Sequence, residues 1–177
     1  MPREKLAMSD QVTKDIGKNL QDGIGLHGSF LIEHIREGQV IDAIEVNNVI
    51  TNVGKAEVAG LFTTDTLSGL TAFDYIAIGT GTTAADATDT QLETEITTGG
   101  GARRGGANVT GTRTNTTVTN DTAQYVTTFT FTATFAVTES GVLNADSTGI
   151  LLSHQTFAAI NVASGDSLQI TWKVAVA

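Results

Sequence analysis

A strict alternation of apolar and polar residues makes 123–138 the strongest structural signal in the chain. From Phe129 to Val137 every second residue is apolar, and the residues between them are threonines and one alanine. Period-two alternation in β-branched and aromatic residues predicts a strand with one buried and one solvent-facing side. About 16 residues at roughly 3.3 Å each would span about 50 Å, far more than an average strand. We therefore expect this segment to bend across two sheets or to reach past its own domain.

Similar alternation predicts strands on both sides of this segment. The run at 108–119 precedes Asn120–Asp121, whose short polar side chains suit a tight turn. A hairpin is expected over 28–46 with its turn at Glu37–Gly38, because glycine accepts positive φ. Residues 139–144 are interpreted as a turn-rich corner. Further strands are expected at 72–79, 149–157 and 168–176, which gives about seven strands in all.

Helical patterns are short. Asn52 is expected to cap a helix over 53–61. Asp89 is expected to cap a second short helix that carries Leu92 and Ile96 inward. These two helices are brief interruptions of a chain that is otherwise rich in strands.

A third helical pattern occupies residues 5–22, where apolar residues recur at i, i+4 and include Val12, Ile16 and Leu20. Gly23 supplies a stop signal. The apolar stripe is one residue wide, which is narrow for a helix that belongs to a core. The segment is thus either a frayed amphipathic tail or an arm that becomes ordered against a neighbouring subunit. Translation could begin at Met1 or at Met8.

These patterns predict a mainly β protein. We expect an antiparallel β-sandwich, jelly-roll-like or Ig-like in size, with an N-terminal helical arm and one or two short helices. The arm is assigned to residues 1–27 and the sandwich domain to residues 28–177.

Composition narrows the classes of partner. The formal net charge is −9, and only 6% of the residues are aromatic. An acidic chain repels nucleic acid and anionic membrane surfaces, so neither is an expected partner. The chain has no cysteine, which excludes disulfides and thiolate metal sites. No apolar run approaches the ~20 residues that span a bilayer, and no secretory signal is visible, so we expect synthesis in the cytoplasm.

No pattern of a catalytic or cofactor site emerges. Gly79-Thr-Gly-Thr follows a strand, but it lacks the remaining residues of a dinucleotide or phosphate loop. The histidines His27, His34 and His154 do not have metal-ligand spacing, and His34 is expected at a half-buried or exposed strand position. A triad of distant Ser, His and Asp stays open, but no Gly-x-Ser-x-Gly elbow is present. We therefore assign no catalytic, cofactor-binding or metal-binding residue.

Two charged segments remain to be interpreted. Asp86, Asp89, Glu93 and Glu95 could supply oxygens to Ca²⁺, but they lack the Asp-x-Asp-x-Asp-Gly spacing, so a solvated acidic loop is favoured. The pair Arg103–Arg104 lies between glycines, like a basic hook for the carboxylates of a neighbouring subunit. Together with Val12, Ile16 and Leu20 of the arm, and with the strand edges at 108–119, these arginines are the expected subunit contacts.

Several segments resemble structural proteins of tailed-bacteriophage virions. The last of them reads Gly165-Asp-Ser-Leu-Gln-Ile-Thr-Trp-Lys-Val. The others are 28–42, 47–54, 75–86, 89–96, 139–144 and 151–157. The resemblance extends over roughly residues 28–176 and leaves the arm outside it.

The resemblance implies a β-sandwich without catalytic activity that is present in repeated symmetric copies. A capsid decoration (cement) protein is the favoured role. Its partners would be the major capsid protein or other virion proteins and copies of itself, with a trimer favoured, and its location would be the virion. The alternatives are a tail, collar or baseplate component, a receptor- or carbohydrate-binding module of a fibre, and, last, an enzyme of cryptic type.

Overall fold

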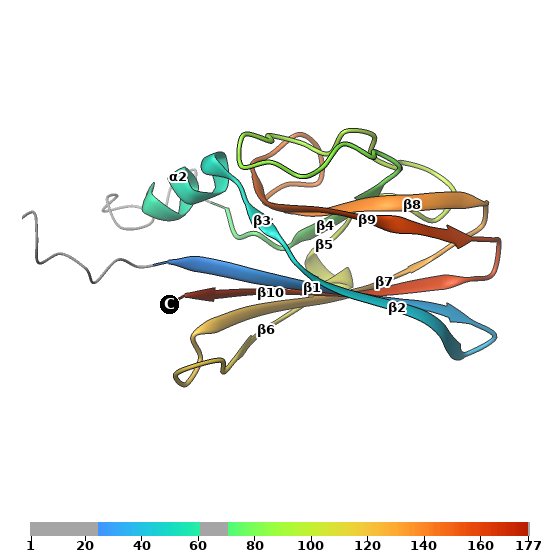
Figure 1. Cartoon of the computed structure of the whole chain (residues 1–177), viewed down its shortest axis with the longest axis horizontal. Helices are drawn as coiled ribbons and strands as arrows, with labels where there is room; N and C mark the ends of the chain where they lie inside the picture. The colour runs from blue at the N-terminus through green and yellow to red at the C-terminus, as the bar shows by residue number, and fades with distance from the viewer. Residues whose placement is uncertain (1–24, 61–70, 177) are drawn as a thin grey trace, which may run out of the picture.

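The structure, a computed structural model, describes residues 25–60 and 71–176, and in them the chain is mainly β (Figure 1). Ten strands form two five-stranded sheets in which every pair of neighbouring strands is antiparallel. The first sheet has the order β2-β1-β10-β7-β6. Its strands are β1 (Leu26–Arg36), β2 (Gln39–Asn47), β6 (Thr110–Thr114), β7 (Thr122–Thr130) and β10 (Ser167–Val176).

The second sheet has the order β3-β9-β8-β4-β5. Its strands are β3 (Val49–Ile50), β4 (Tyr75–Gly79), β5 (Arg104–Gly105), β8 (Phe135–Leu143) and β9 (Leu151–Val162). One helix, α2 (Asn52–Gly60), follows β3, and a short 3₁₀ helix occupies Gly106–Asn108. No helix within the described ranges is long and apolar enough to cross a membrane.

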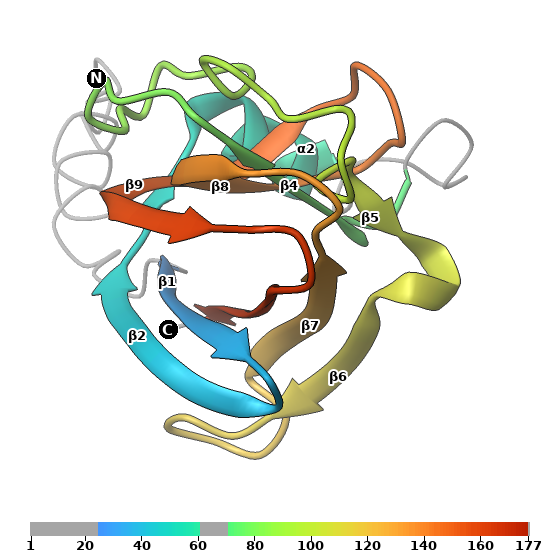
Figure 2. The same cartoon turned by 90° about the vertical axis from the view of Figure 1, so that its right-hand side faces the viewer.

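The hydrophobic core lies between the two sheets, which face each other in Figure 2. Phe30 of β1 contacts Trp172 of β10, with ring centroids 4.7 Å apart, and stacks on Phe157 of β9 at 5.3 Å. Trp172 also donates a hydrogen bond from Nε1 to Ser140 Oγ of β8 at 3.3 Å. Aromatic side chains from one sheet therefore fill the space against the other.

The long alternating segment at 123–138 bends across the two sheets, which is one of the two outcomes expected from its length. β7 ends at Thr130 in the first sheet, and β8 begins at Phe135 in the second. Between them Phe131 donates its backbone N–H to Asp166 O at 2.9 Å. The alternation continues through the crossing because apolar residues face the shared core on both sides of it.

The turn at Glu37–Gly38 is confirmed. Glu37 has φ of 52° and Gly38 has φ of 75°, which is the two-residue geometry that suits a twisted hairpin. In the next expected turn, Asn120 has φ of 62°, and Asp121 accepts the backbone N–H groups of the preceding residues 116–118 at 2.6–2.8 Å. A seven-residue loop therefore joins β6 to β7 in place of a two-residue turn.

The cap of α2 was assigned to the wrong residue. Thr51 Oγ1, not Asn52, accepts the backbone N–H of Gly54 at 3.0 Å. Thr51 is fully buried and also donates its hydroxyl to Leu151 O, so the cap fixes the helix to β9. An exposed Asn52 cannot make that connection.

Two further expectations are wrong. Residues 139–144, read as a corner, lie in and directly after β8 and are buried. No helix follows Asp89; residues 80–103 form an irregular segment, although Leu92 and Ile96 are buried as expected. The polar residues of these two segments form hydrogen bonds inside the fold instead of marking a turn or a helix cap.

The N-terminal arm with Val12, Ile16 and Leu20 lies outside the described residues, apart from its last three positions. Leu26 and His27 belong to β1, so the first strand begins before the expected domain boundary at Gly28.

Candidate functional site

A group of buried ionisable side chains lies where residues 80–98 cover the second sheet. In Figure 1 this green segment runs over the side of β8 and β9 that faces away from the first sheet. A small apolar cluster of Ala77, Leu92, Leu143 and Leu151 packs beneath it. Next to that cluster, Glu139 of β8 and His154 of β9 meet Asp89 of the covering segment.

His154 is held between two carboxylates. Its Nδ1 lies 2.7 Å from Asp89 Oδ2, and its Nε2 lies 3.1 Å from Glu139 Oε2. Glu139 is fully buried and His154 is 3% exposed. A carboxylate can only accept, so a histidine that satisfies both partners must donate from both nitrogens, which requires the imidazolium form.

Glu139 also organises the backbone above it. Oε1 accepts the N–H of Gly81 at 3.0 Å and that of Thr94 at 2.7 Å, and Oε2 accepts the N–H of Glu93 at 2.9 Å. A Cβ on Gly81 would come within 2.6 Å of Oε1. The absence of a side chain at position 81 thus lets the backbone approach this buried carboxylate.

The pKa values shift as this geometry requires. Burial alone would lower the pKa of His154, but its hydrogen bonds to Glu139 and Asp89 outweigh burial and raise it above 6.5. Burial alone would raise the pKa of Glu139, but the hydrogen bonds from His154 and from the three backbone N–H groups lower it below 4.5. Both shifts favour the charged forms, the imidazolium of His154 and the carboxylate of Glu139.

A hollow of about 300 Å³ opens beside His154. It is lined by Thr83, Ala84, residues 88–93 and His154. General acid–base catalysis needs a ring nitrogen within reach of a substrate, and here each nitrogen faces a carboxylate. No hydroxyl among the described residues is hydrogen-bonded to the imidazole. The arrangement joins the covering segment to the second sheet.

The four acidic residues of the expected solvated loop all have partners within the chain. Asp89 contacts His154, and Glu93 accepts the backbone N–H groups of Thr82 and Thr83 at 2.8 and 2.9 Å. Asp86 accepts from Thr88, and Glu95 pairs with Arg103. In residues 25–60 and 71–176 no group of three or more His, Cys, Asp or Glu side chains is placed to hold a metal ion.

The two arginines of the expected basic hook both bind within the chain. Arg103 donates from Nε and Nη2 to the two oxygens of Glu95 at 2.9 and 2.6 Å. Its Nη1 donates to the carbonyls of Ala145 and Thr148 at 2.6 and 3.0 Å. Arg104 lies over the Phe129 ring, 5.7 Å from the centroid. Pairing with carboxylates of a neighbouring subunit stays a prediction. Little of the Arg103 side chain is exposed for such a contact.

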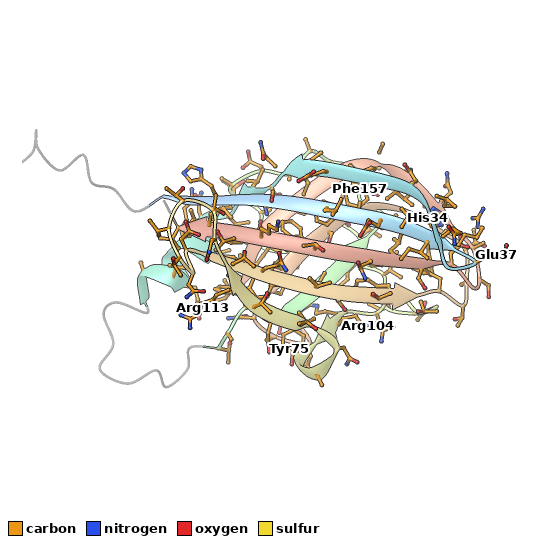
Figure 3. The ribbon with its side chains drawn as sticks, turned by 90° about the horizontal axis from the view of Figure 1, so that it is seen from below. His34, Glu37, Tyr75, Arg104, Arg113 and Phe157 are labelled. Atoms are coloured by element: carbon orange, nitrogen blue, oxygen red, sulfur yellow. The ribbon has the colours of Figure 1, made fainter. Side chains whose placement is uncertain are left out.

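A second charged group, at the other end of the strands, joins the β1–β2 hairpin to the β9–β10 turn. Asp166 accepts hydrogen bonds from Arg36 Nε and Nη2 at 2.8 and 2.7 Å and lies 2.9 Å from His34 Nε2. The Arg36 guanidinium holds the pKa of Asp166 well below its usual range. His34 is only 4% exposed, so the expected half-buried or exposed position is wrong. Figure 3 shows His34 near Glu37, at the tip of the hairpin.

Sequence patterns did not identify Glu139 or His154 as partners. Glu139 follows Thr138 in a segment that looks like a turn, and His154 stands alone among Ser153 and Gln155. The available signal was that each is the only ionisable residue of its strand. A buried ionisable residue in such a strand needs an opposite charge nearby.

Comparison with known proteins identifies no relative: no family model, curated protein or solved structure matches the chain. Functional interpretation therefore depends on the contacts described above.

Proposed function

We propose that this chain is a non-enzymatic structural protein of a tailed-bacteriophage virion, in the role of a capsid decoration (cement) protein. The observation that carries the proposal is that the buried ionisable groups are directed at one another. His154, Glu139 and Asp166 each bind partners that connect separate elements of the fold. Such contacts make a rigid body suited to repeated use in an assembly.

The architecture supports this role. Two antiparallel sheets with a shared core are the arrangement of a β-sandwich, of jelly-roll-like or Ig-like size. A net charge of −9 suits the outer surface of a capsid, away from packaged DNA. A decoration protein acts by mass action, because binding only to the assembled shell shifts the equilibrium away from disassembly.

The partners in this proposal are the major capsid protein and further copies of this chain, arranged as trimers. The fibre-module alternative is disfavoured by the aromatic residues. Sugar binding by stacking needs exposed aromatic rings, whereas Trp172 is fully buried and Tyr125 packs against the core.

Localisation on purified particles tests the proposal. The virions whose genome encodes the chain would be imaged by cryo-electron microscopy, with copy number checked by quantitative mass spectrometry. Copies repeated over the whole shell lattice are expected, and particles that lack the protein should dissociate at a lower temperature. A few copies at the neck or tail would assign the chain to the tail, collar or baseplate class. Absence from virions would overturn the proposal.

A further inference from the structure

An apolar hollow opens at the end of the sandwich where β1 begins and β10 ends. In Figure 1 the same end carries α2 and the loop from β6 to β7. The hollow has a volume of about 280 Å³, and residues of both sheets line it. Most of its lining is apolar and includes Leu26, Val58, Phe73, Tyr125, Leu152 and Val174.

Exposed apolar side chains extend this surface beyond the hollow. Val176, which lines the hollow, is 48% exposed, and Val118 in the loop from β6 to β7 is 63% exposed. Val118 donates its backbone N–H to Asp121, another lining residue, at 2.8 Å. The other two exposed large apolar side chains of the described ranges, Val40 and Ile41, belong to the hairpin at the opposite end. Apolar side chains gathered around a hollow indicate a docking site.

The rim of the hollow carries one cation and one anion. Arg113 of β6 and Asp121 of the following loop both line it, and Figure 3 shows Arg113 at this end of the molecule. Neither side chain forms an ion pair with a residue that the structure describes. An apolar segment that enters the hollow is therefore complementary to the rim if it carries charges of both signs.

The N-terminal arm leads directly to this hollow. Leu26 is the first residue of β1, and it lines the hollow. In the arm, Ile16 and Leu20 belong to an apolar stripe that is one residue wide, and they lie one helical turn apart in the expected helix. Lys14 and Asp15 adjoin Ile16 and supply charges of both signs. A stripe too narrow for a core helix matches a small hollow with a charged rim.

We propose that this hollow is the docking site of the chain's own N-terminal arm, with Ile16 and Leu20 inside it. The connection is long enough, because the six residue steps from Leu20 to Leu26 span up to about 20 Å when extended. Gly23 and Gly25 allow the chain to reverse its direction there. A tethered segment has a millimolar effective concentration at its site, which favours the chain's own arm over that of a second copy. The inference does not rest on the viral role.

Hydrogen exchange of the full chain, measured by mass spectrometry, is the first test. Docking should slow the exchange of residues 12–20 about tenfold or more relative to an unstructured chain, because a docked helix keeps its backbone N–H groups hydrogen-bonded. Leu20→Asp should return these residues to the rate of an unstructured chain. Asn19→Asp is the matched control, since it adds the same charge beside the stripe, and it should leave the exchange rate unchanged.

The same measurement tests the receiving surface. Val176→Asp places a charge in the hollow and should release the arm, so that residues 12–20 exchange about tenfold faster. Val40→Asp is its control, because Val40 is 54% exposed at the opposite end, against 48% for Val176. Circular dichroism checks that both variants are folded. Release of the arm by both substitutions, or by neither, would overturn the assignment of this hollow.

Cross-linking distinguishes the chain's own arm from that of a second copy. Cysteines are introduced as the pair Asn19→Cys and Val118→Cys, which lie outside the hollow in a chain that has no other cysteine. A short bismaleimide should link them within one chain, at a rate independent of protein concentration, and should link Asn19→Cys to Val40→Cys at least tenfold more slowly. Links formed mainly between copies would overturn the inference, and so would an arm that exchanges as an unstructured chain in the unmodified protein.

Discussion

His154 Nε2 lies 3.1 Å from Glu139 Oε2, and neither residue has more than 3% of its surface exposed. Two neighbouring strands, β9 and β8, contribute the two residues, and Asp89 contacts the remaining ring nitrogen from the covering segment. A buried charge pair of this kind adds little stability relative to a well-packed apolar pair. Its importance is that loss of one partner leaves the other charged and buried.

Glu139→Ala should therefore be strongly destabilising. It removes the acceptor for three backbone N–H groups and leaves His154 with one carboxylate. We expect a loss of about 3–5 kcal/mol in the free energy of unfolding. Glu139→Gln keeps an oxygen at Oε1, so its loss should be smaller. Urea denaturation followed by tryptophan fluorescence measures both, and equal stability of Glu139→Ala and the unmodified protein would contradict the assigned role.

The same pair predicts how stability depends on pH. The pKa of His154 is raised above 6.5 in the folded state, so its contribution is fully present below pH 6.5 and is lost as the pH rises through the folded pKa. The pKa of Glu139 is lowered below 4.5, so its contribution is present above pH 4.5 and is lost as the pH falls through the folded pKa.

Urea midpoints should thus decline as the pH rises above 6.5 and through the folded pKa of His154, and His154→Gln should flatten that decline. Proton NMR of the imidazole C–H resonances gives the pKa directly. A His154 resonance that titrates below pH 6.5 would show that the imidazolium is not the form held between the carboxylates.

Local patterns were sufficient for much of the fold. The alternation at 168–176 predicts β10, and Glu37–Gly38 predicts the first hairpin turn, because both depend on residues close in sequence. The length of 123–138 predicted either a bend across two sheets or an extension past the domain, and the structure has the bend. In these cases the side chains report directly on which face of a strand is buried.

Polar residues that bind partners far along the chain could not be predicted in the same way. Glu139 interacts with residues 58 and 46 positions before it, at Gly81 and Glu93. Nothing within a few residues of Glu139 indicates those partners, and its polarity resembles that of a turn. Arg103 is a similar case: its glycine-rich surroundings indicate a mobile loop, whereas its guanidinium is fixed by Glu95.

The Arg103–Glu95 pair provides a test of that difference. Arg103 fixes the turn after β8 through the carbonyls of Ala145 and Thr148, so Arg103→Lys should loosen residues 144–150. Lysine cannot make the paired contacts of a guanidinium, and we expect a loss of about 1–3 kcal/mol. Hydrogen exchange measured by mass spectrometry should show faster exchange in this turn. Exchange that changes only in β5, or nowhere, would mean that Arg103 does not hold the turn.

A final prediction concerns how closely α2 packs on β9. A Cβ added to Gly54 would lie 2.6 Å from the Cα of Leu152 and 2.8 Å from its carbonyl oxygen, and backbone atoms cannot move away as the end of a side chain can. Gly54→Ala gains up to about 1 kcal/mol of helix propensity, but overpacking should cost about 1–3 kcal/mol, so we expect a net loss. Gly111→Ala is the matched control, because a Cβ there meets nothing within 4 Å. The test compares the urea midpoints of the two variants. If Gly54→Ala is as stable as Gly111→Ala, α2 does not pack as closely on β9 as this contact indicates.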